Sequence, residues 1–417
     1  MATPSLSWYA FLHDFTDPGI DAAIDELEAT GASGASIAMV YHTARDLLPT
    51  NPRRRMRFMT GGTHYYQPES SLYSNALPAP RVDPELDGRD PLRNVVRVLA
   101  RRSLRFDAWV VFGHNSSLAS ERPDLAQRNA FGDIIATDLC PANPIGRARA
   151  ISIVLDVCRY DPSAIVAESL HFHGLRHGYH HERYLLELGP LAELCLSLCF
   201  CEHCCDAARA AGIDVGGVRR FAQDAALEAF AGRVRPDMAE LTHNDLHPYL
   251  DGQLLAFVEH RCSLVASLVA EAADVAALHG VKLVFNDPSG ASKGYADGHP
   301  TGAPAVESGW PFGVSIGGLA GTVAAIGMLG YARDCARIES DLDGYQDAIG
   351  STDTALRLSL RPSHPDVAAA SDLAVKLEVA TSRGVGRVDL YHFGLVPQAS
   401  RDMVRAVATG TAVLGPS

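Results

Sequence analysis

The feature that most restricts the fold of this 417-residue chain is the alternation of short apolar segments with amphipathic ones. Eight apolar segments have the length and flanking turn residues of buried β-strands, and predicted helices alternate with them. The predicted strands span residues 6–16, 35–42, 106–117, 164–171, 281–290, 324–334, 354–365 and 386–397. Eight strands that alternate with helices predict an α/β fold, specifically a (β/α)8 TIM barrel.

The connections between these segments differ greatly in length. A helix is predicted directly after the first strand, with Asp17 as its N-cap, Pro18 at its first position and Gly31 at its end. Three connections are much longer, at residues 45–80, 172–205 and 288–315, and we expect them to be loops inserted into the barrel. We find no linker, so residues 1–417 are expected to form a single TIM-barrel domain.

Composition excludes several classes of partner. The chain is 47% hydrophobic and has a formal net charge of −13, and its basic runs do not exceed the three arginines at 53–55. An acidic chain without a basic patch does not favour nucleic acid. Its apolar stretches are too interrupted for a membrane span, and its first residues lack the features of a signal peptide. Nine cysteines, several of them close together, fit a reducing cytoplasm and a metal site better than a disulfide framework.

Polar residues collect where the predicted strands end. In a parallel barrel the carboxyl ends of the strands form the active face, so these side chains are expected to share one site. We expect the following residues of this group, together with His177 of the adjoining loop, to bind substrate: Asp14, His42, His114, Asn115, His171, Arg361, Tyr391 and His392. The aromatic residues Trp8, Tyr41, Trp310 and Tyr391 offer rings for stacking on a ligand, although core packing is the commoner use of such residues.

A cysteine-rich segment follows the fourth predicted strand. Cys199, Cys201 and Cys204 have the spacing C-x-C-x-x-C, which lets several thiolates converge on one tetrahedral zinc ion. The fourth ligand could be Cys140, Cys205 or His203, and we favour Cys140 because it would clamp two long loops together. A closed set of four cysteines would make the zinc structural. The alternative is a group of buried free thiols.

These residues carry a resemblance to a known family. The segment LCPANPIGRARAISIVLDVCRYDPSAIVAESL and the later CFCEHCCDAARAAGIDVGGVRRF lie within residues 139–221. They resemble the core of zinc-containing β-galactosidase-type glycoside hydrolases of the TIM-barrel clan, and the whole chain is similar to uncharacterised glycosidase-like bacterial barrels. The resemblance implies that Cys140, Cys199, Cys201 and Cys204 hold a structural zinc.

The sequence departs from that family at its catalytic positions. The family has an Asn-Glu pair at the end of the fourth strand, whereas here Ala167 precedes Glu168. Without gaps, His173 falls where the family has its glutamate. The family also has a nucleophilic glutamate after the seventh strand, where this chain has Arg361 and His364.

The predicted function is cleavage of a small glycoside or oligosaccharide by carboxyl groups. Burial in the fourth strand would raise the pKa of Glu168, as a general acid requires, and Asp287 is the second carboxyl candidate. His173 is a third catalytic candidate. Each carboxyl group also has a non-catalytic alternative. Glu168 could form an ion pair with Arg357 or Arg361, and Asp287 could form an Asx-turn.

Two other functions remain open from the sequence. Histidines and an acidic residue of the 172–205 loop could bind a catalytic metal for a sugar isomerase, epimerase or lyase: His173, His177, His180, His181 and Glu182. A barrel that binds carbohydrate without catalysis is the other alternative. The 45–80 loop would also suit contacts in a homo-oligomer.

Overall fold

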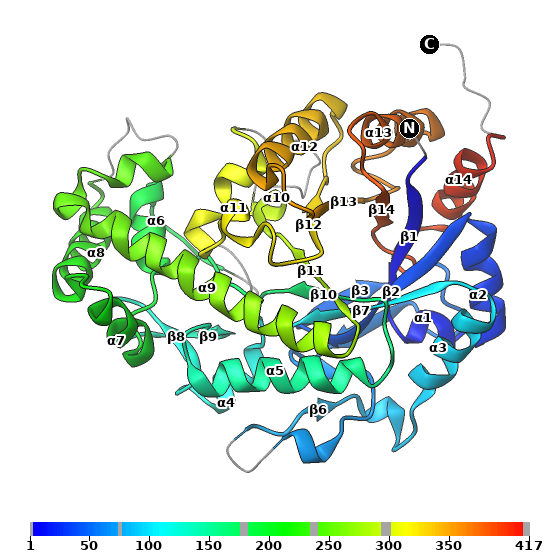
Figure 1. Cartoon of the computed structure of the whole chain (residues 1–417), viewed down its shortest axis with the longest axis horizontal. Helices are drawn as coiled ribbons and strands as arrows, with labels where there is room; N and C mark the ends of the chain where they lie inside the picture. The colour runs from blue at the N-terminus through cyan, green and yellow to red at the C-terminus, as the bar shows by residue number, and fades with distance from the viewer. Residues whose placement is uncertain (1–2, 74–76, 176–181, 234–240, 293–301, 412–417) are drawn as a thin grey trace.

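The computed structural model describes residues 3–73, 77–175, 182–233, 241–292 and 302–411 (Figure 1). His177, His180 and His181 therefore lie outside the described residues. Within the described ranges, no helix combines the length and the apolar character that crossing a bilayer demands.

The centre of the molecule is a closed barrel of parallel strands. Its members are β1 (Ser5–Ala10), β2 (Ala32–Tyr41), β7 (Arg105–Val111), β10 (Ala164–Glu168), β11 (Lys282–Asn286), β12 (Ala325–Leu329), β13 (Ala355–Leu360) and β14 (Arg387–Leu390). Each strand pairs in parallel with the next, and β1 pairs with both β2 and β14, which closes the ring. The predicted TIM barrel is confirmed, with every barrel strand inside or overlapping its predicted segment.

Helices surround the strands in the expected alternation (Figure 1). The longer ones are α2 (Ile20–Ala29), α3 (Pro91–Arg101), α5 (Pro144–Cys158), α8 (Val215–Phe230), α9 (Gln253–Leu278), α12 (Cys335–Ile349), α13 (Ala370–Ser382) and α14 (Gln398–Ala408). Helices α5 and α9 pack side by side along the barrel. The helices α6 (Pro190–Ser197), α7 (Glu202–Ala210) and α8 gather at one end of the molecule, beyond the barrel.

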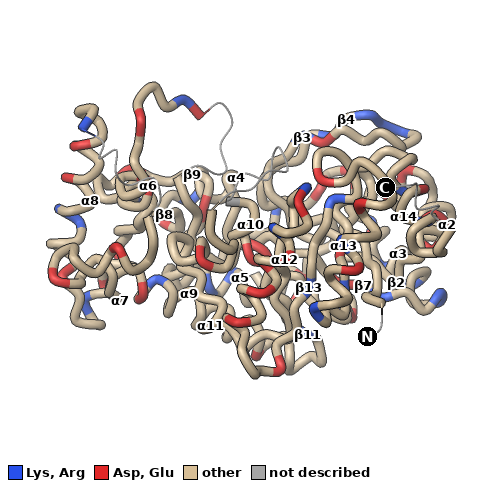
Figure 2. Tube along the Cα trace, turned by 90° about the horizontal axis from the view of Figure 1, so that it is seen from above, with Lys and Arg blue, Asp and Glu red and all other residues tan. Residues whose placement is uncertain are grey.

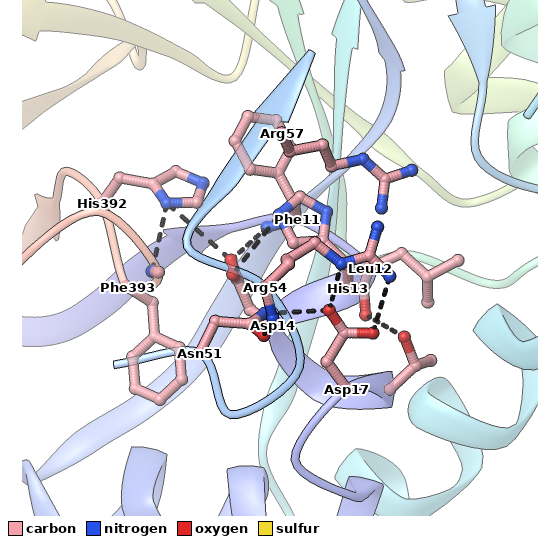
Figure 3. A network of polar contacts seen from close by, with 12 residues as sticks. Phe11, Leu12, His13, Asp14, Asp17, Asn51, Arg54, Arg57, His392 and Phe393 are labelled. Carbon is pink, nitrogen blue, oxygen red and sulfur yellow. Dashed lines mark hydrogen bonds and ion pairs between the residues drawn. The ribbon is translucent and has the colours of Figure 1, made fainter. Parts of the chain in front are cut away.

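The predicted start of the first helix was wrong. The chain turns into the short helix α1 (His13–Thr16) soon after β1, and α2 begins after Gly19, which is its N-cap. The Asp17 carboxylate instead accepts hydrogen bonds from Asn51 and Arg54 (Figure 3). Asp17 therefore anchors the 45–80 segment to the barrel, a long-range role that a local capping pattern does not reveal.

The 45–80 segment contains regular structure that its composition did not suggest. Strands β3 (Ala44–Leu47) and β4 (Met56–Met59) form an antiparallel pair, and β5 (Thr63–His64) extends the barrel sheet from the edge of β2. The basic run lies just before β4 (Figure 2), where Arg53 and Arg54 pair with Asp17, and Arg54 also pairs with Glu85. Two of its three arginines are thus partly neutralised by carboxylates.

The barrel interior is polar near the amino ends of the strands. Asp107 on β7 pairs with Arg357 on β13 at 3.0 Å and with Arg387 on β14 at 2.7 Å. Arg387 also pairs with Asp389 at 2.7 Å. Trp109, two residues further along β7, starts the next layer towards the carboxyl ends of the strands. The ion pairs therefore form a floor beneath the aromatic layer that supports the site.

Candidate active site

The carboxyl ends of the strands surround a cavity of about 710 Å³. Eight of the residues predicted to act in catalysis or to bind substrate line it: Glu168, Asp287, His173, His42, His114, His171, Arg361 and Tyr391. Trp109, Asn286, Tyr331 and Trp310 also line it. Most of the polar residues predicted from their positions at strand ends therefore line the same cavity.

Glu168 is the last residue of β10 and faces this cavity. Its Oε2 accepts hydrogen bonds from Trp109 Nε1 at 2.8 Å and from Asn286 Nδ2 at 3.3 Å. Burial raises the pKa of Glu168, and the two donors limit this rise because they stabilise the ionised form. The carboxyl group is therefore held in one orientation and favours its protonated form more than an exposed glutamate does.

The arginine pairing considered for Glu168 does not occur. Arg357 pairs with Asp107 on the floor, and Arg361 pairs with Asp366 through two hydrogen bonds of 2.5 and 2.7 Å. An adjacent arginine would lower the pKa of the carboxyl group and hold it ionised. The observed partners leave Glu168 able to exchange a proton.

The backbone beyond Glu168 turns sharply. Ser169 has a φ of 61°, which is the left-handed region and uncommon for a residue with a side chain. The Ser169 carbonyl oxygen would lie 2.6 Å from a Cβ at Gly113, so the neighbouring strand end requires glycine there. Unusual backbone of this kind is concentrated at functional sites.

Asp287 lies at the cavity wall, but its carboxylate is buried. Its Oδ1 accepts hydrogen bonds from Ser289 Oγ at 2.9 Å and Ser289 N at 3.3 Å, and its Oδ2 accepts one from the Tyr345 hydroxyl. Burial raises its pKa to about 6. The bond to Ser289 N is that of an Asx-turn, so this geometry favours the turn-forming role over direct contact with substrate.

A row of imidazoles occupies another side of the cavity. The ring centroids of His42 and His114, and those of His114 and His173, are 5.0 Å apart, and His171 lies 4.8 Å from His173. Asp138 lies between two of them, with its Oδ1 3.0 Å from His114 Nδ1 and 2.5 Å from His173 Nδ1. Burial alone would raise the pKa of Asp138, but the two imidazoles lower it below its usual range.

Asp138 was missed by the sequence analysis. It belongs to β9 (Ile134–Leu139), which pairs with β8 (Ala126–Arg128) outside the barrel, so the strand-end rule does not reach it. Its position two residues before Cys140 was the available signal, because a clamp at Cys140 fixes the end of this hairpin.

Three residues expected to bind substrate lie outside the cavity lining. Asp14 Oδ2 accepts a hydrogen bond from Phe11 N at 2.8 Å, and His392 Nδ1 accepts one from Gly394 N at 3.2 Å (Figure 3). Asn115 is the N-cap of α4 (Ser116–Glu121). These side chains have local structural roles, because the chain turns away from the barrel mouth within a few residues of each strand end.

Aromatic residues also line the cavity. The Arg361 guanidinium lies over the Tyr331 ring at 4.9 Å, and the hydroxyls of Tyr391 and Tyr41 are 3.4 Å apart. Trp310 also lines the cavity, whereas Trp8 is fully buried in the core and donates a hydrogen bond to Thr30. The cavity thus combines polar groups with flat apolar rings, the usual composition of a small-molecule site.

The four predicted cysteines form one buried cluster. The Cys140 sulfur lies 3.4 Å from that of Cys204, 3.5 Å from Cys201 and 3.9 Å from Cys199. A tetrahedral ion with metal–sulfur bonds of about 2.3 Å would hold its sulfurs about 3.8 Å apart. The cluster therefore fits a metal ion, and Cys140, rather than Cys205 or His203, completes the set. Cys205 instead contacts the Phe200 carbonyl and Arg219.

Fold and cavity together define a TIM-barrel protein with a cavity at the carboxyl ends of its strands. No family model matches the sequence, and no curated protein matches it. Among solved structures, an α-L-fucosidase from Paenibacillus thiaminolyticus matches with a TM-score of 0.54 and 10% identity, covering 98% of this chain and 49% of that one. A β-galactosidase from Marinomonas ef1 matches with a TM-score of 0.56 and 11% identity, covering 98% and 60%.

This chain thus spans about half to three-fifths of the length of these neighbours. At such identities the likeness establishes the shared barrel and nothing finer. The residues that would act in this chain must be judged from its own cavity.

Proposed function

We propose that this protein is a glycoside hydrolase that cleaves a small glycoside or an oligosaccharide, with Glu168 as the general acid. The observation that carries this proposal is the environment of Glu168: a carboxyl group in a cavity at the carboxyl end of the fourth barrel strand, with a raised pKa and two oriented donors. Hydrolysis of a glycoside needs a group that protonates the leaving oxygen, and a raised pKa suits that task.

The hydrogen bonds of Glu168 suggest which atom transfers the proton. Both donors reach Oε2, so we assign the proton to Oε1. Once Oε1 has given its proton to the leaving oxygen, Trp109 and Asn286 stabilise the resulting carboxylate. Tyr391 and Trp310 offer rings to the sugar, and His42, His114 and Arg361 offer donors to its hydroxyls.

Two residues are candidates for the second reacting group, Asp287 and His173. Asp287 is the carboxyl candidate, with a pKa raised to about 6, although both its oxygens accept hydrogen bonds. It would act by stabilising positive charge on the sugar or by activating water after releasing Tyr345 or Ser289. His173 is the alternative base, since it lines the same cavity.

We assign zinc to the cysteine cluster, with a structural role. Four sulfur ligands suit zinc and leave it no open position, so the ion would supply rigidity and no chemistry. Cys140 follows β9, and Cys199, Cys201 and Cys204 lie before and within the first turn of α7, so the ion would tie two distant segments together. None of the nine cysteines forms a disulfide, and we propose a reducing cytoplasm as the compartment.

The test is hydrolysis of a panel of aryl glycosides by the wild type and by Glu168→Gln. Loss of the general acid should lower kcat about 10² to 10⁴-fold while leaving the fold intact. Glu378→Gln is the matched control, because Glu378 is exposed on α13. Equal turnover by wild type and Glu168→Gln would refute the assignment. Sugar binding by calorimetry without any product would instead indicate a binding protein.

A further inference from the structure

We propose that His114, Asp138 and His173 form a second metal site, for a divalent transition-metal ion, at the wall of the cavity. One nitrogen from each histidine and one oxygen of Asp138 lie within 4.8 Å of one another, and all three residues are buried. Two imidazoles and one carboxylate are a frequent ligand set for zinc and for non-haem iron. The proposal does not depend on glycoside hydrolysis, because metal binding is measured directly.

The separations of the ligand atoms suit an ion after a small adjustment. Metal bonds of about 2.0 to 2.2 Å place neighbouring ligand atoms about 3 to 3.5 Å apart. The 3.0 Å separation between His114 Nδ1 and Asp138 Oδ1 already meets this requirement. His173 Nδ1 lies 2.5 Å from the same oxygen, so its ring must move outward by about half an ångström when an ion enters.

Groups behind the ligands are arranged as they are around known metal sites. The second oxygen of Asp138 accepts a hydrogen bond from the Thr137 hydroxyl, which turns Oδ1 towards the imidazoles. The far nitrogen of His173, Nε2, lies 3.5 Å from Ser169 Oγ. Outer partners of this kind fix the orientation of ligating carboxylates and histidines.

The surrounding scaffold holds the three residues from separate directions. His114 follows β7, His173 follows β10, and Asp138 is held two residues before Cys140 of the cysteine cluster. Imidazole binds a metal ion in its neutral form, so a divalent cation would outweigh the single negative charge of an ionised Asp138. His114 and His173 both line the cavity with Glu168, so an ion here would face the substrate's oxygen atoms.

The rival occupant of this cluster is a proton, shared between Asp138 and the imidazoles as a simple ion pair. Cobalt titration of the metal-depleted full-length protein separates the two. Cobalt in the cysteine cluster gives an intense thiolate charge-transfer band, whereas cobalt bound by nitrogen and oxygen does not. We expect the wild type to bind a further cobalt ion after this band saturates. Elemental analysis of the zinc-loaded protein should likewise show one zinc ion more than the cysteine cluster holds.

His173→Gln and His114→Gln should each lose that further ion and keep the thiolate band, which also reports that the fold is intact. His279→Gln, at an exposed position after α9, is the matched control and should keep both ions. A wild type that binds cobalt or zinc only at the cysteine cluster would overturn the proposal. Retention of the further ion by both cavity variants would overturn it equally.

Discussion

The hydrogen bond from Trp109 to Glu168 allows a quantitative prediction. Trp109→Phe keeps an aromatic ring in the layer above the floor but removes the indole N–H, which donates to Glu168 Oε2 at 2.8 Å. That donor stabilises the ionised carboxylate, so its removal should raise the pKa of Glu168 further. The basic limb of a pH–activity profile that depends on protonated Glu168 should therefore move to higher pH.

The size of this change follows from the charge on the acceptor. A hydrogen bond to an ionised group contributes roughly 1.5–3 kcal/mol, and one pKa unit corresponds to about 1.4 kcal/mol, which gives about one to two units. Glu168 faces the cavity, so water can replace part of the lost bond. We therefore expect a rise of about one unit, at the lower end of that range.

Two measurements check this prediction independently. The first is the pH dependence of kcat/KM for an aryl glycoside. The second is NMR titration of carboxyl-labelled glutamates, with Glu168→Gln to identify the signal, which needs no activity. Trp310→Phe is the matched control, because Trp310 lines the same cavity, while the donors to Glu168 among the described residues are Trp109 and Asn286. A pKa that falls, or that does not change in Trp109→Phe, would show that the indole does not tune this acid.

Three further predictions concern stability and metal content. Asp107→Ala leaves Arg357 and Arg387 without their shared carboxylate, so urea unfolding should show a loss of about 3 to 5 kcal/mol; a loss below about 1 kcal/mol would contradict the floor as described. Cys201→Ser should lose the cluster's ion by elemental analysis and lower the Tm, and an unchanged metal content would rule out the cluster as the ion's site. Burial raises the folded-state pKa of Asp14 from an ordinary 3.8 to about 7, so between these values the folded protein keeps a proton that the unfolded chain releases. The free energy of unfolding of the wild type should therefore fall as pH rises through this window, relative to Asp14→Asn, and parallel pH profiles would refute this reasoning.

The barrel could be predicted from the sequence because the pattern that indicates it, an apolar strand followed by a helix, is local and repeated. Apolar runs such as 164–171 and 281–290 are buried on both faces, and their alternation with helices admits few topologies. The cysteine cluster was also predictable, because the spacing of Cys199, Cys201 and Cys204 lets several thiolates converge on one point. Both predictions rest on local sequence patterns that do not depend on long-range packing.

The direction in which a side chain points beyond a strand end is not a local property. Asp14, His42 and His392 all lie just beyond a strand end. His42 lines the cavity, whereas Asp14 and His392 form local hydrogen bonds with the backbone of Phe11 and Gly394 (Figure 3). Asp138 contacts His114 and His173 from a hairpin outside the barrel, a position set by long-range packing. The sequence therefore indicated which end of the barrel holds the cavity, but not which strand-end side chains line it.

An amide lies beside Glu168 although the sequence lacks the asparagine expected directly before it. The resembling family carries asparagine immediately before its glutamate, and here Ala167 occupies that position. In the barrel, Ala167 pairs with Phe285 of the neighbouring strand, which brings the next residue, Asn286, beside Glu168. Its amide donates to the carboxylate at 3.3 Å. Parallel register thus places an amide of β11 beside Glu168, the group that we propose as the general acid.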